Sequence, residues 1–480
     1  MKHTHTSHPF VRIAFTLKRS SVLGLLCLSA CNMIPTYQQP VLPVPTSYGS
    51  AVSASAVTGQ ALAADLHWHQ VYADGKLQQL IAEALKNNRD MRVALLNIEK
   101  ARLQYRVKGA ALFPSIDASG TESRQRTSGD LSATGEPSTS GTYGVNVGFS
   151  GYELDLFGRV RSLKQQSLQT FLATEADQYS TKISLIAEVA SAYYTLAADQ
   201  ALLALAQQTF SAQQDTLKLT QRKLEIGVEN QLTVSQQQTL VEEARADTAN
   251  YTAQVAIDKS ALALLIGGEV SPALLPPAIT AFPKVALDLP AGLPSDMLTR
   301  RPDIMSAEHS LLAANANIGA ARAAFFPKIA LTATAGTSST DLARLFMGGT
   351  GVWSFIPSIT IPIFNWGSNS ANLNIARVER DITVSTYEKT IQTAFKEVSD
   401  GLVKATGLRE QVKAYEVRQS AAQQSLQLSK ARFDYGVDAY LSVLDAQRTL
   451  YSTQKTLISM QLAQLNNYAT LYKALGGGWQ

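Results

Sequence analysis

Apolar residues recur at helical spacing over an unusually long part of the chain. Glycine and proline are absent from Arg159 to Ile226, and apolar residues return there every three or four positions: Leu168, Leu172, Tyr179, Ile183, Ile186, Val189, Tyr193 and Leu196. This spacing predicts one amphipathic helix, which at ~1.5 Å per residue would be ~100 Å long. A second run without glycine or proline, from Val228 to Ile266, predicts a helix that returns after a turn at Gly227. No single globular core is that long, so we expect these long helices to pack on one another.

Other segments alternate between apolar and polar positions, which is typical of strands. Odd-numbered positions are apolar in Tyr143–Ser150 and in Lys328–Ala335, and also in Trp353–Ile361, where Ile356 is an exception. A fourth segment, from Ser115 to about Thr127, is mostly polar. Each has about the ~10 residues that cross an outer membrane when tilted. Aromatic residues at the strand ends predict an interfacial girdle: Phe113, Tyr152, Phe157, Phe326, Phe364 and Trp366. The edge of a soluble sandwich remains the alternative.

The body of the chain is a tandem duplication. Ala110–Ile116 returns 213 residues later as Ala323–Ile329, and further along the offset is 209, so that Gly227-Val228 matches Gly436-Val437. The first copy is predicted to cover 77–268, with strands at about 115–127 and 142–152 and a long helix pair at 159–266. The second is predicted to cover 301–476, with strands at about 327–337 and 352–363 and a helix pair at 367–475. A proline-rich linker, 269–300, separates them. Within the second copy, Gly401 and Gly407 are each expected to weaken the first long helix by ~1 kcal/mol.

The N-terminal residues have the pattern of an export signal. Four basic residues precede the apolar stretch Ser21–Leu28, and no acidic residue occurs before Cys31. Leu28-Ser29-Ala30-Cys31 resembles a bacterial lipobox, so we expect residues 1–30 to be a lipoprotein signal peptide and Cys31 to carry a lipid; ordinary secretory cleavage is the alternative. Residues 31–76 are expected to form a lipidated tether. Removing the signal leaves 38 basic residues against 38 acidic ones, so the charge does not indicate nucleic-acid binding.

Candidate chemistry is sparse. The two cysteines, Cys27 and Cys31, fall in or beside the signal peptide, which argues against a disulfide scaffold or a cysteine metal site. The sequence contains no phosphate-binding loop, nucleophile elbow or HExxH motif. His67-Trp68-His69 is more typical of packing than of a metal pair, and His309 is expected to be structural. We therefore predict that the protein is not an enzyme, with no catalytic residue, no metal and no cofactor beyond the lipid on Cys31.

Four strands cannot close a barrel, and a sheet in lipid cannot leave an edge unpaired. The chain must therefore oligomerise. The lipobox, the tether, the duplicated helix–hairpin–helix unit and the stretches Leu77–Asn88 and Arg432–Leu450 together resemble the TolC-like outer membrane factor family, in particular its NodT-type lipoprotein branch. This resemblance implies a mixed α/β membrane protein: a trimeric 12-stranded outer-membrane β-barrel with four strands per chain, continuing into a long periplasmic α-helical barrel.

The same resemblance implies a function and partners. The protein would be a passive exit duct of a tripartite efflux system for drugs and small toxic compounds, lipid-anchored in the cell outer membrane and extending into the periplasm. Its partners would be two further copies of itself, a periplasmic membrane-fusion adaptor, an inner-membrane pump of the resistance-nodulation-division type and outer membrane lipid, with no nucleic acid. A type I secretion duct for polypeptides and a structural lipoprotein scaffold without a pore are the alternatives.

Two sets of residues are candidate sites. The turns Gly227-Val228 and Gly436-Val437 are expected to form periplasmic tips that dock the adaptor, unless these glycines only shape the turns. After the second tip, Leu441, Asp445 and Arg448 are spaced i, i+4 and i+7 and so share one helix face. The resemblance implies that these positions form the closed periplasmic gate, as rings of Leu and Asp; an exposed helix pair is the alternative. The TolC-like relatives have two Asp rings, whereas this chain has Ser442 and Asp445.

Overall fold

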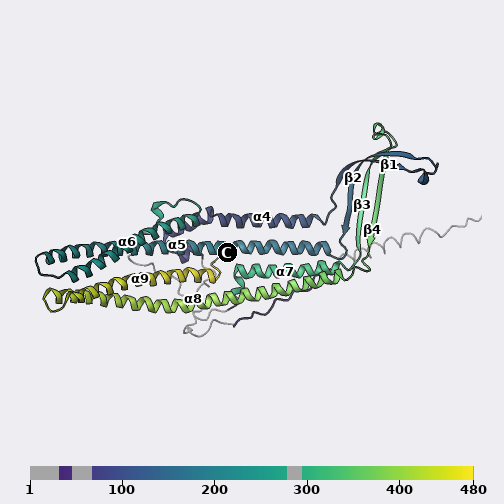
Figure 1. The fold of residues 1–480 in the computed structure, drawn as a ribbon. Helices are drawn as coiled ribbons and strands as arrows, with labels where there is room; N and C mark the ends of the chain where they lie inside the picture. Colours follow the sequence, from purple (N-terminus) through teal and green to yellow (C-terminus); the bar gives the residue numbers. More distant parts are fainter. Residues whose placement is uncertain (1–31, 46–66, 278–294, 479–480) are drawn as a thin grey trace, which may run out of the picture. The chain divides into compact units, whose positions relative to one another are not determined.

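The computed structural model describes residues 32–45, 67–277 and 295–478. Helices and one four-stranded sheet make up these ranges (Figure 1). By contacts the chain divides into two units. The first, which we call the sheet unit, contains 32–40, 99–173 and 307–387. The second, the helical unit, contains the other described residues. Cys31, the predicted signal peptide, much of the predicted tether and part of the predicted linker lie outside the described residues.

The sheet is antiparallel, with its strands in chain order and β1 and β4 at its edges. Its strands are β1 (Asp117–Thr127), β2 (Ser138–Leu154), β3 (Lys328–Ser339) and β4 (Gly351–Thr360). The register pairs Val147 with Ala335 and Ala335 with Trp353, so the odd-numbered residues of β3 and β4 share one face with those of β2 up to Phe149. Beyond the irregularity in β2 the parity changes, and Tyr152 pairs with Leu331. That face is exposed in the single chain, with Trp353 80% accessible. The predicted alternation of apolar and polar positions is therefore confirmed.

β1 and β3 agree with the expected limits to within two residues, and the larger differences are in β2 and β4. β2 is longer than predicted at both ends, and its pairing with β3 shifts between Phe149 and Tyr152, where Gly151 has a φ of 67°. Such an irregularity lets a long strand bend without ending. β4 stops at Thr360 rather than at 363. Pro362 follows closely, and because proline has no N–H to donate to the ladder it favours the end of a strand.

The long helices are continuous, as their composition predicts. α5 (Arg159–Glu225) and α8 (Ser368–Asp434) each have 67 residues, and α6 (Gln231–Ile266) and α9 (Tyr440–Ala474) return after the glycine turns. The shorter helices are α2 (Trp68–Val71), α3 (Gly75–Asn87), α4 (Arg89–Ala110) and α7 (Pro302–Ala323), with 3₁₀ turns η3 (Gly129–Leu131), η4 (Pro272–Leu274), η5 (Ser295–Arg300) and η6 (Leu342–Arg344). No helix within the described ranges is both long and apolar enough to cross a membrane.

In the helical unit, both copies of the duplication have an equivalent side-chain hydrogen bond to the C-terminal end of the returning helix. The Asn88 amide donates to the carbonyl of Leu265 at 2.8 Å, and the Arg301 guanidinium donates to the carbonyl of Ala474 at 2.6 Å. Leu265 and Ala474 are 209 residues apart, which is the sequence offset. In each copy a polar side chain just before a short helix therefore binds the C-terminal turn of the returning helix, whose last carbonyls have no partner within the helix.

The tether was predicted to cover 31–76, but residues 67–76 instead contain α2 and the start of α3. Residues 32–45 contain neither helix nor strand. This segment was expected to be part of a tether. It is not free of contacts, however, because the Pro35 carbonyl accepts a hydrogen bond from Asn315 of α7 at 2.8 Å. This contact lies within the sheet unit.

Candidate functional site

The first predicted tip is the turn between α5 and α6. Gly227 has a φ of 74°, and the N–H of Val228 donates to the carbonyl of Lys223 at 2.8 Å. This is the usual way in which a left-handed glycine ends a helix and satisfies its last carbonyls. The Asn230 side chain then caps α6 by accepting from the N–H of Thr233 at 2.9 Å. Val228 remains 68% exposed, so the turn presents an apolar side chain to its surroundings.

The second tip repeats this geometry between α8 and α9. Gly436 has a φ of 71°, the N–H of Val437 donates to the carbonyl of Arg432 at 2.9 Å, and Val437 is 61% exposed. A Cβ on either glycine would meet nothing within 4 Å. Glycine is therefore required at Gly227 and Gly436 for the backbone angle and not for space.

The two tips differ in their charged residues. Arg432 makes a two-bonded pair with Asp438, at 2.5 and 3.0 Å, and the guanidinium lowers the pKa of that carboxyl. The matching residues of the first copy are Lys223 and Glu229. The Lys223 ammonium lies over the Phe433 ring instead, 5.4 Å from its centre, so the first tip contacts the second.

The three predicted gate residues share the exposed face of α9. Leu441 is 51% exposed, and the side chains of Asp445 and Arg448 are 64% and 52% exposed. The buried side of the same segment is apolar: Val443, Leu444, Ala446 and Leu450. Asp445 Oδ1 lies 3.9 Å from Arg448 Nη1, at the limit of an ion pair. Such an exposed contact contributes little to stability within one chain, which leaves both side chains available to face other molecules.

A buried amide network behind this face was missed by the sequence reasoning. The Gln237 amide, which is fully buried, donates to the side-chain oxygen of Gln213 at 2.6 Å, and Gln213 donates to Gln447 at 3.2 Å. The Tyr440 hydroxyl donates to Gln237 at 3.1 Å, and burial together with the Glu229 carboxylate raises the pKa of Tyr440 to about 12. The signal was the run Gln236–Gln238 in a helix most of whose other buried positions are apolar. The network ties α5, α6 and α9 together.

A groove of about 510 Å³ between α5, α6 and α9 lies next to this network. Tyr451 and Lys455 of α9 line it, and both bind Asp247 of α6, at 2.7 and 2.8 Å. Lys455 thus has a carboxylate partner and is not a free cation in the groove. The bonds to Asp247 form a second polar connection between α6 and α9, beside the amide network.

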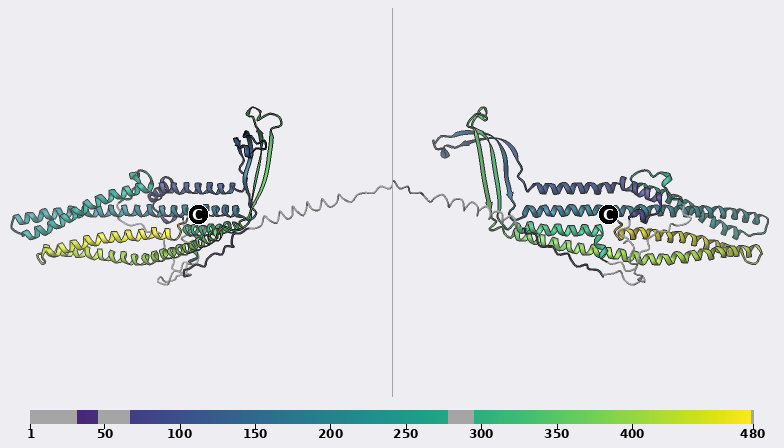
Figure 2. Two further views of the ribbon diagram at one scale, coloured as in Figure 1. Left: turned by 45° about the vertical axis from the view of Figure 1, so that its right-hand side comes forward. Right: turned by 180° about the vertical axis from the view of Figure 1, so that it is seen from behind.

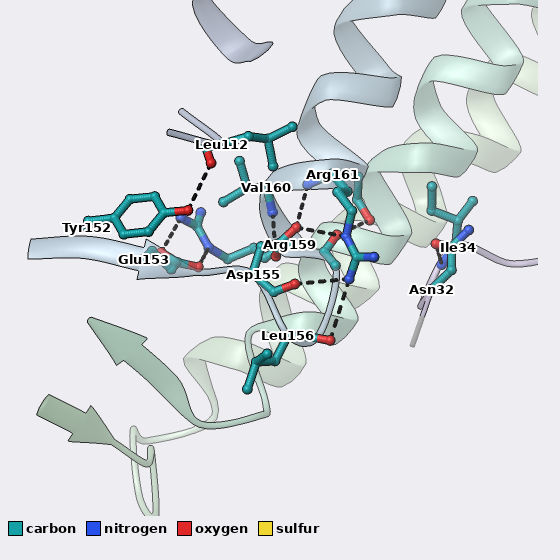
Figure 3. A network of polar contacts seen from close by, with 12 residues as sticks. Asn32, Ile34, Leu112, Tyr152, Glu153, Asp155, Leu156, Arg159, Val160 and Arg161 are labelled. Atoms are coloured by element: carbon teal, nitrogen blue, oxygen red, sulfur yellow. Dashed lines mark hydrogen bonds and ion pairs between the residues drawn. The ribbon is translucent and has the colours of Figure 1, made fainter. Parts of the chain in front are cut away.

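Within the sheet unit, charged pairs stabilise the short connection between β2 and α5 (Figure 3). Glu153 binds Arg159 through two bonds of 2.8 and 2.7 Å. Asp155 accepts from the N–H groups of Val160 and Arg161, at 3.0 and 2.8 Å, and so caps the start of α5. Carboxylates at a helix N-terminus are favourable because they satisfy its free N–H groups.

The predicted aromatic girdle residues form close pairs at the strand ends. Phe157 stacks on Phe326 with ring centres 4.8 Å apart, and Phe364 lies 4.9 Å from Trp366. Trp366 is 89% exposed. Their contact with a membrane interface stays a prediction.

The histidines near the tether lie close together. His67 and His69 approach through their Nδ1 atoms at 3.3 Å, and His69 stacks on Trp68 with ring centres 3.5 Å apart. Within the residues that the structure describes, no group of three or more His, Cys, Asp or Glu side chains is placed to hold a metal ion.

Two long hairpins and a four-stranded antiparallel sheet are the features to compare with known families. The sequence profile of the family described as "Outer membrane efflux protein" matches residues 80–268 and 293–477, so the chain belongs to this family. The toluene efflux pump outer membrane protein TtgC of Pseudomonas putida is 48% identical over 454 residues, which cover 94% of this chain and 93% of TtgC. Outer membrane protein OprJ of Pseudomonas aeruginosa is 41% identical, over 96% of this chain and 95% of OprJ.

Solved structures agree with this assignment. A membrane protein from Pseudomonas aeruginosa superposes with a TM-score of 0.87 at 39% identity, covering 94% of this chain and 98% of that chain. The open state of the MtrE outer membrane channel of Neisseria gonorrhoeae gives 0.84 at 39% identity, over 94% and 99% of the two chains. The expected fold class, an outer membrane sheet continued by long helices, and the expected location in the outer membrane are confirmed.

Proposed function

We propose that this chain is the outer-membrane exit duct of a tripartite efflux system, in which three copies close one barrel. The observation that carries the proposal is the sheet, which has two edges unpaired in the single chain, β1 and β4, and exposed apolar side chains such as Trp353, Phe355 and Ile359. In lipid such edges must find partners. Pairing β4 of one chain with β1 of the next satisfies both edges, and three chains supply twelve strands, enough for a wide channel.

The cargo class follows from the relatives. Proteins 44–48% identical to this chain are named as toluene, solvent and antibiotic efflux pump outer membrane proteins. We infer that small toxic compounds are also passed here, delivered by an inner-membrane pump of the resistance-nodulation-division type through a periplasmic adaptor. The duct itself is passive, and the pump supplies the energy.

The gate of this duct is assigned to Leu441, Asp445 and Arg448. In a trimer their exposed face gives one apolar ring and one acidic ring, and such rings can block or select solutes. The buried amide network behind this face holds each α9 to the neighbouring hairpin, which would keep the rings in register.

The test is single-channel conductance of the purified protein in planar bilayers. The double variant Leu441→Ala with Asp445→Ala is expected to conduct several-fold more than the wild type. The matched control is Gln236→Ala, because Gln236 occupies the position of Asp445 in the first copy; it is expected to conduct like the wild type. Equal conductance in all three proteins would overturn the gate. Absence of any conductance from intact trimers would overturn the duct and favour a scaffold.

Adaptor docking is assigned to the exposed valines of the two tips, Val228 and Val437. Their replacement by Trp is expected to abolish drug resistance and crosslinking to the adaptor while the yield of trimer stays normal. Val417→Trp, at a valine of α8 that is 66% exposed, serves as the control. Unchanged crosslinking and resistance in the tip variants would show that these residues only shape the turns. If the wild-type protein restored export of a polypeptide but not drug resistance in a strain that lacks its own duct, the type I secretion alternative would be favoured.

The proposal includes a lipid on Cys31, supported by the lipobox-like sequence Leu28-Ser29-Ala30-Cys31. The lipid would act together with the apolar face of the sheet as a second membrane signal.

A further inference from the structure

The charged side chains of β1 share a face with apolar residues of the sheet. The register pairs Glu122 with Tyr143 and Arg124 with Gly141, so the even-numbered residues of β1 lie on the same face as the odd-numbered residues of β2. The side chain of Arg124 crosses that face, because a Cβ on Gly141 would lie 3.7 Å from Arg124 Cγ. β1 therefore adds charged residues to the face that carries Trp353.

These residues lie at the outer end of the sheet, which is the end away from the start of α5. Pairing of β2 with β3 begins only at Tyr143, whereas β1 and β2 stay paired up to Thr127 and Ser138. Figure 2 shows this two-stranded ribbon in blue, extending away from the green strands β3 and β4. Arg124 and Arg126 both belong to the ribbon, and both are exposed.

The opposite face of the sheet is crowded, which indicates the direction in which the sheet curves. A Cβ on Gly148 would strike the carbonyl oxygen of Ala333, and a Cβ on Gly336 would strike that of Val145. Both glycines are even-numbered, so these close approaches lie on the face away from Trp353. Glycines at such positions let a sheet bend toward the face that they leave empty. This concave face lies inside a closed barrel, and the convex face, with Trp353 and the arginines, lies outside against lipid.

The length of the strands sets the level of the arginines in the membrane. On the convex face of β3, Ile329 and Ser339 are ten residues apart, which is ~34 Å along the strand. At a tilt of ~40° they are ~26 Å apart across the membrane, close to the ~25 Å of the apolar band of a barrel. Tyr143 pairs with Ser339 and so lies at the outer limit of this band, where aromatic residues are expected. At the same tilt, Arg124 and Arg126 lie ~5 and ~10 Å beyond that limit, at the level of lipid headgroups.

Both arginines are accessible to an anionic ligand. Arg124 Nε lies 3.5 Å from Glu122 Oε1, and these side chains are 72% and 53% exposed. An exposed ion pair contributes little, so a phosphate can compete with the carboxylate, and the planar guanidinium matches phosphate oxygens. With Arg126, this face of the ribbon carries two positive charges and one negative charge. Asp130 and Glu136 follow in the connection between β1 and β2.

We propose that Arg124 and Arg126 bind phosphate groups of lipid headgroups in the outer leaflet of the membrane. The inference rests on the proposed barrel, which places the convex face against lipid. One molecule fits both parts of this surface, because the acyl chains of a lipid cover exposed apolar residues such as Val147 and Trp353 while its phosphates reach the arginines. A soluble anion would leave those apolar residues uncovered. The bound lipid holds the ribbon, which has no β3 beside it, at the membrane surface.

Native mass spectrometry of the purified trimer tests the site, with lipid A, a phosphorylated sugar lipid, as the probe. Arg124→Gln with Arg126→Gln is expected to weaken binding of lipid A about 30-fold, because each arginine near an anionic lipid surface contributes about fivefold. Lipid A without its phosphates should bind the wild type about as weakly as lipid A binds the variant. Equal affinity of wild type and variant, or binding that does not need the phosphates, would overturn the site.

A matched control moves one charge to the concave face of the same strand. Gln125 pairs with Ser140 and therefore lies on that face. Arg124→Gln alone is expected to weaken binding about fivefold, and adding Gln125→Arg should not restore it, although it restores the net charge. Restored binding would show that only the charge of the ribbon matters. Inorganic phosphate at the concentration of lipid A should not displace it, and displacement would identify a soluble anion as the occupant instead.

Hydrogen exchange of the wild-type protein tests the same site without a substitution that might disturb folding. Lipid A is expected to slow amide exchange in the ribbon, residues 122–127 and 138–143, relative to the lipid without phosphates, and to leave the tips at Gly227 and Gly436 unchanged. No difference between the two lipids would overturn the site. Conductance tests the barrel separately. Normal conductance with unchanged lipid binding in the arginine variant would refute this site alone, whereas wild-type trimers that do not conduct would refute the duct on which it rests.

Discussion

Two glycines of α8 offer a sharp test of the packing in the helical unit. Gly401 and Gly407 lie six residues apart in the same helix, and both were expected to weaken it. A Cβ on Gly401 would lie 2.5 Å from Leu471 Cδ2 and 2.8 Å from its Cγ, and Leu471 is 1% exposed. A Cβ on Gly407 would meet nothing within 4 Å. We therefore predict opposite signs for the same substitution.

The magnitudes follow from two effects. Replacing a helical glycine by alanine stabilises by ~1 kcal/mol, and Gly407→Ala should gain all of it. At Gly401 the new methyl overpacks a buried leucine, which costs ~1–3 kcal/mol. The buried Asn467 amide also donates to the Gly401 carbonyl at 2.9 Å, so the helix cannot move away without loss. Gly401→Ala should thus be neutral to destabilising by ~2 kcal/mol.

Amide hydrogen exchange of α8 and α9, followed by mass spectrometry, resolves these changes locally. Gly407→Ala should slow exchange about fivefold, and Gly401→Ala should leave it unchanged or speed it up to about 30-fold. Leu471→Ala alone should cost ~2–5 kcal/mol, but less in the Gly401→Ala background, because the added methyl fills part of the cavity. Slower exchange in Gly401→Ala, or additive costs in the double variant, would refute the contact.

Three further predictions concern other parts of the chain. Burial and the neighbouring Asp258 raise the pKa of Asp199 to about 7; because this lies above the ~3.9 of an unfolded chain, the proton stabilises the fold and its contribution is lost as pH rises through 7. The melting temperature should therefore fall between pH 6 and pH 8.5, and less so in Asp199→Asn; equal slopes would contradict this. Gly336→Ala should sharply reduce the folded protein in outer membranes, since its Cβ would strike the backbone of β2, whereas Gly351→Ala, with open space, should not. Cys31→Ser should abolish incorporation of labelled palmitate, and label on that variant would exclude lipidation at this residue.

The elements were predictable because their signals are local and repeated. The absence of glycine and proline from Arg159 to Ile226 leaves no point at which a helix can end, and α5 has no break there. The alternation in Trp353–Ile361 similarly predicted which side of β4 is apolar. The gate residues could be placed on one face by spacing alone. The proposed role at an axis shared by three copies could not be predicted from the spacing, because it depends on the other copies of the chain.

The contacts between elements were not predictable in the same way. Gln213, Gln237 and Gln447 form a buried network, but a glutamine on a helix is usually solvent-exposed, and nothing local marks its partner. Residues 32–39 were expected to be only part of a tether. They contact α7 through the backbone carbonyls of Met33 and Pro35 and through the Tyr37 hydroxyl, and nothing local in the sequence marks these partners. A signal for this contact was Gly319, a glycine in the middle of α7 whose Cβ would lie 2.6 Å from Ile34 Cγ1.

Comparison of the two copies helps to distinguish residues that stabilise the fold from residues that serve the proposed function. Some equivalent positions make the same contact with different side chains. Asn88 and Arg301, for example, both bind the C-terminal end of a returning helix. Where one copy alone has a feature, its counterpart lacks the chemistry: Gln236 stands in place of Asp445, and Arg106 in place of Gly319. One-sided differences also occur in the packed interior, where the buried Gln237 matches Ala446. A difference between the copies therefore indicates a specialised surface only where the side chains are exposed. Asp445 and Arg448 are exposed, which supports the proposed gate in the second copy and predicts that substitutions there alter conductance before they alter folding.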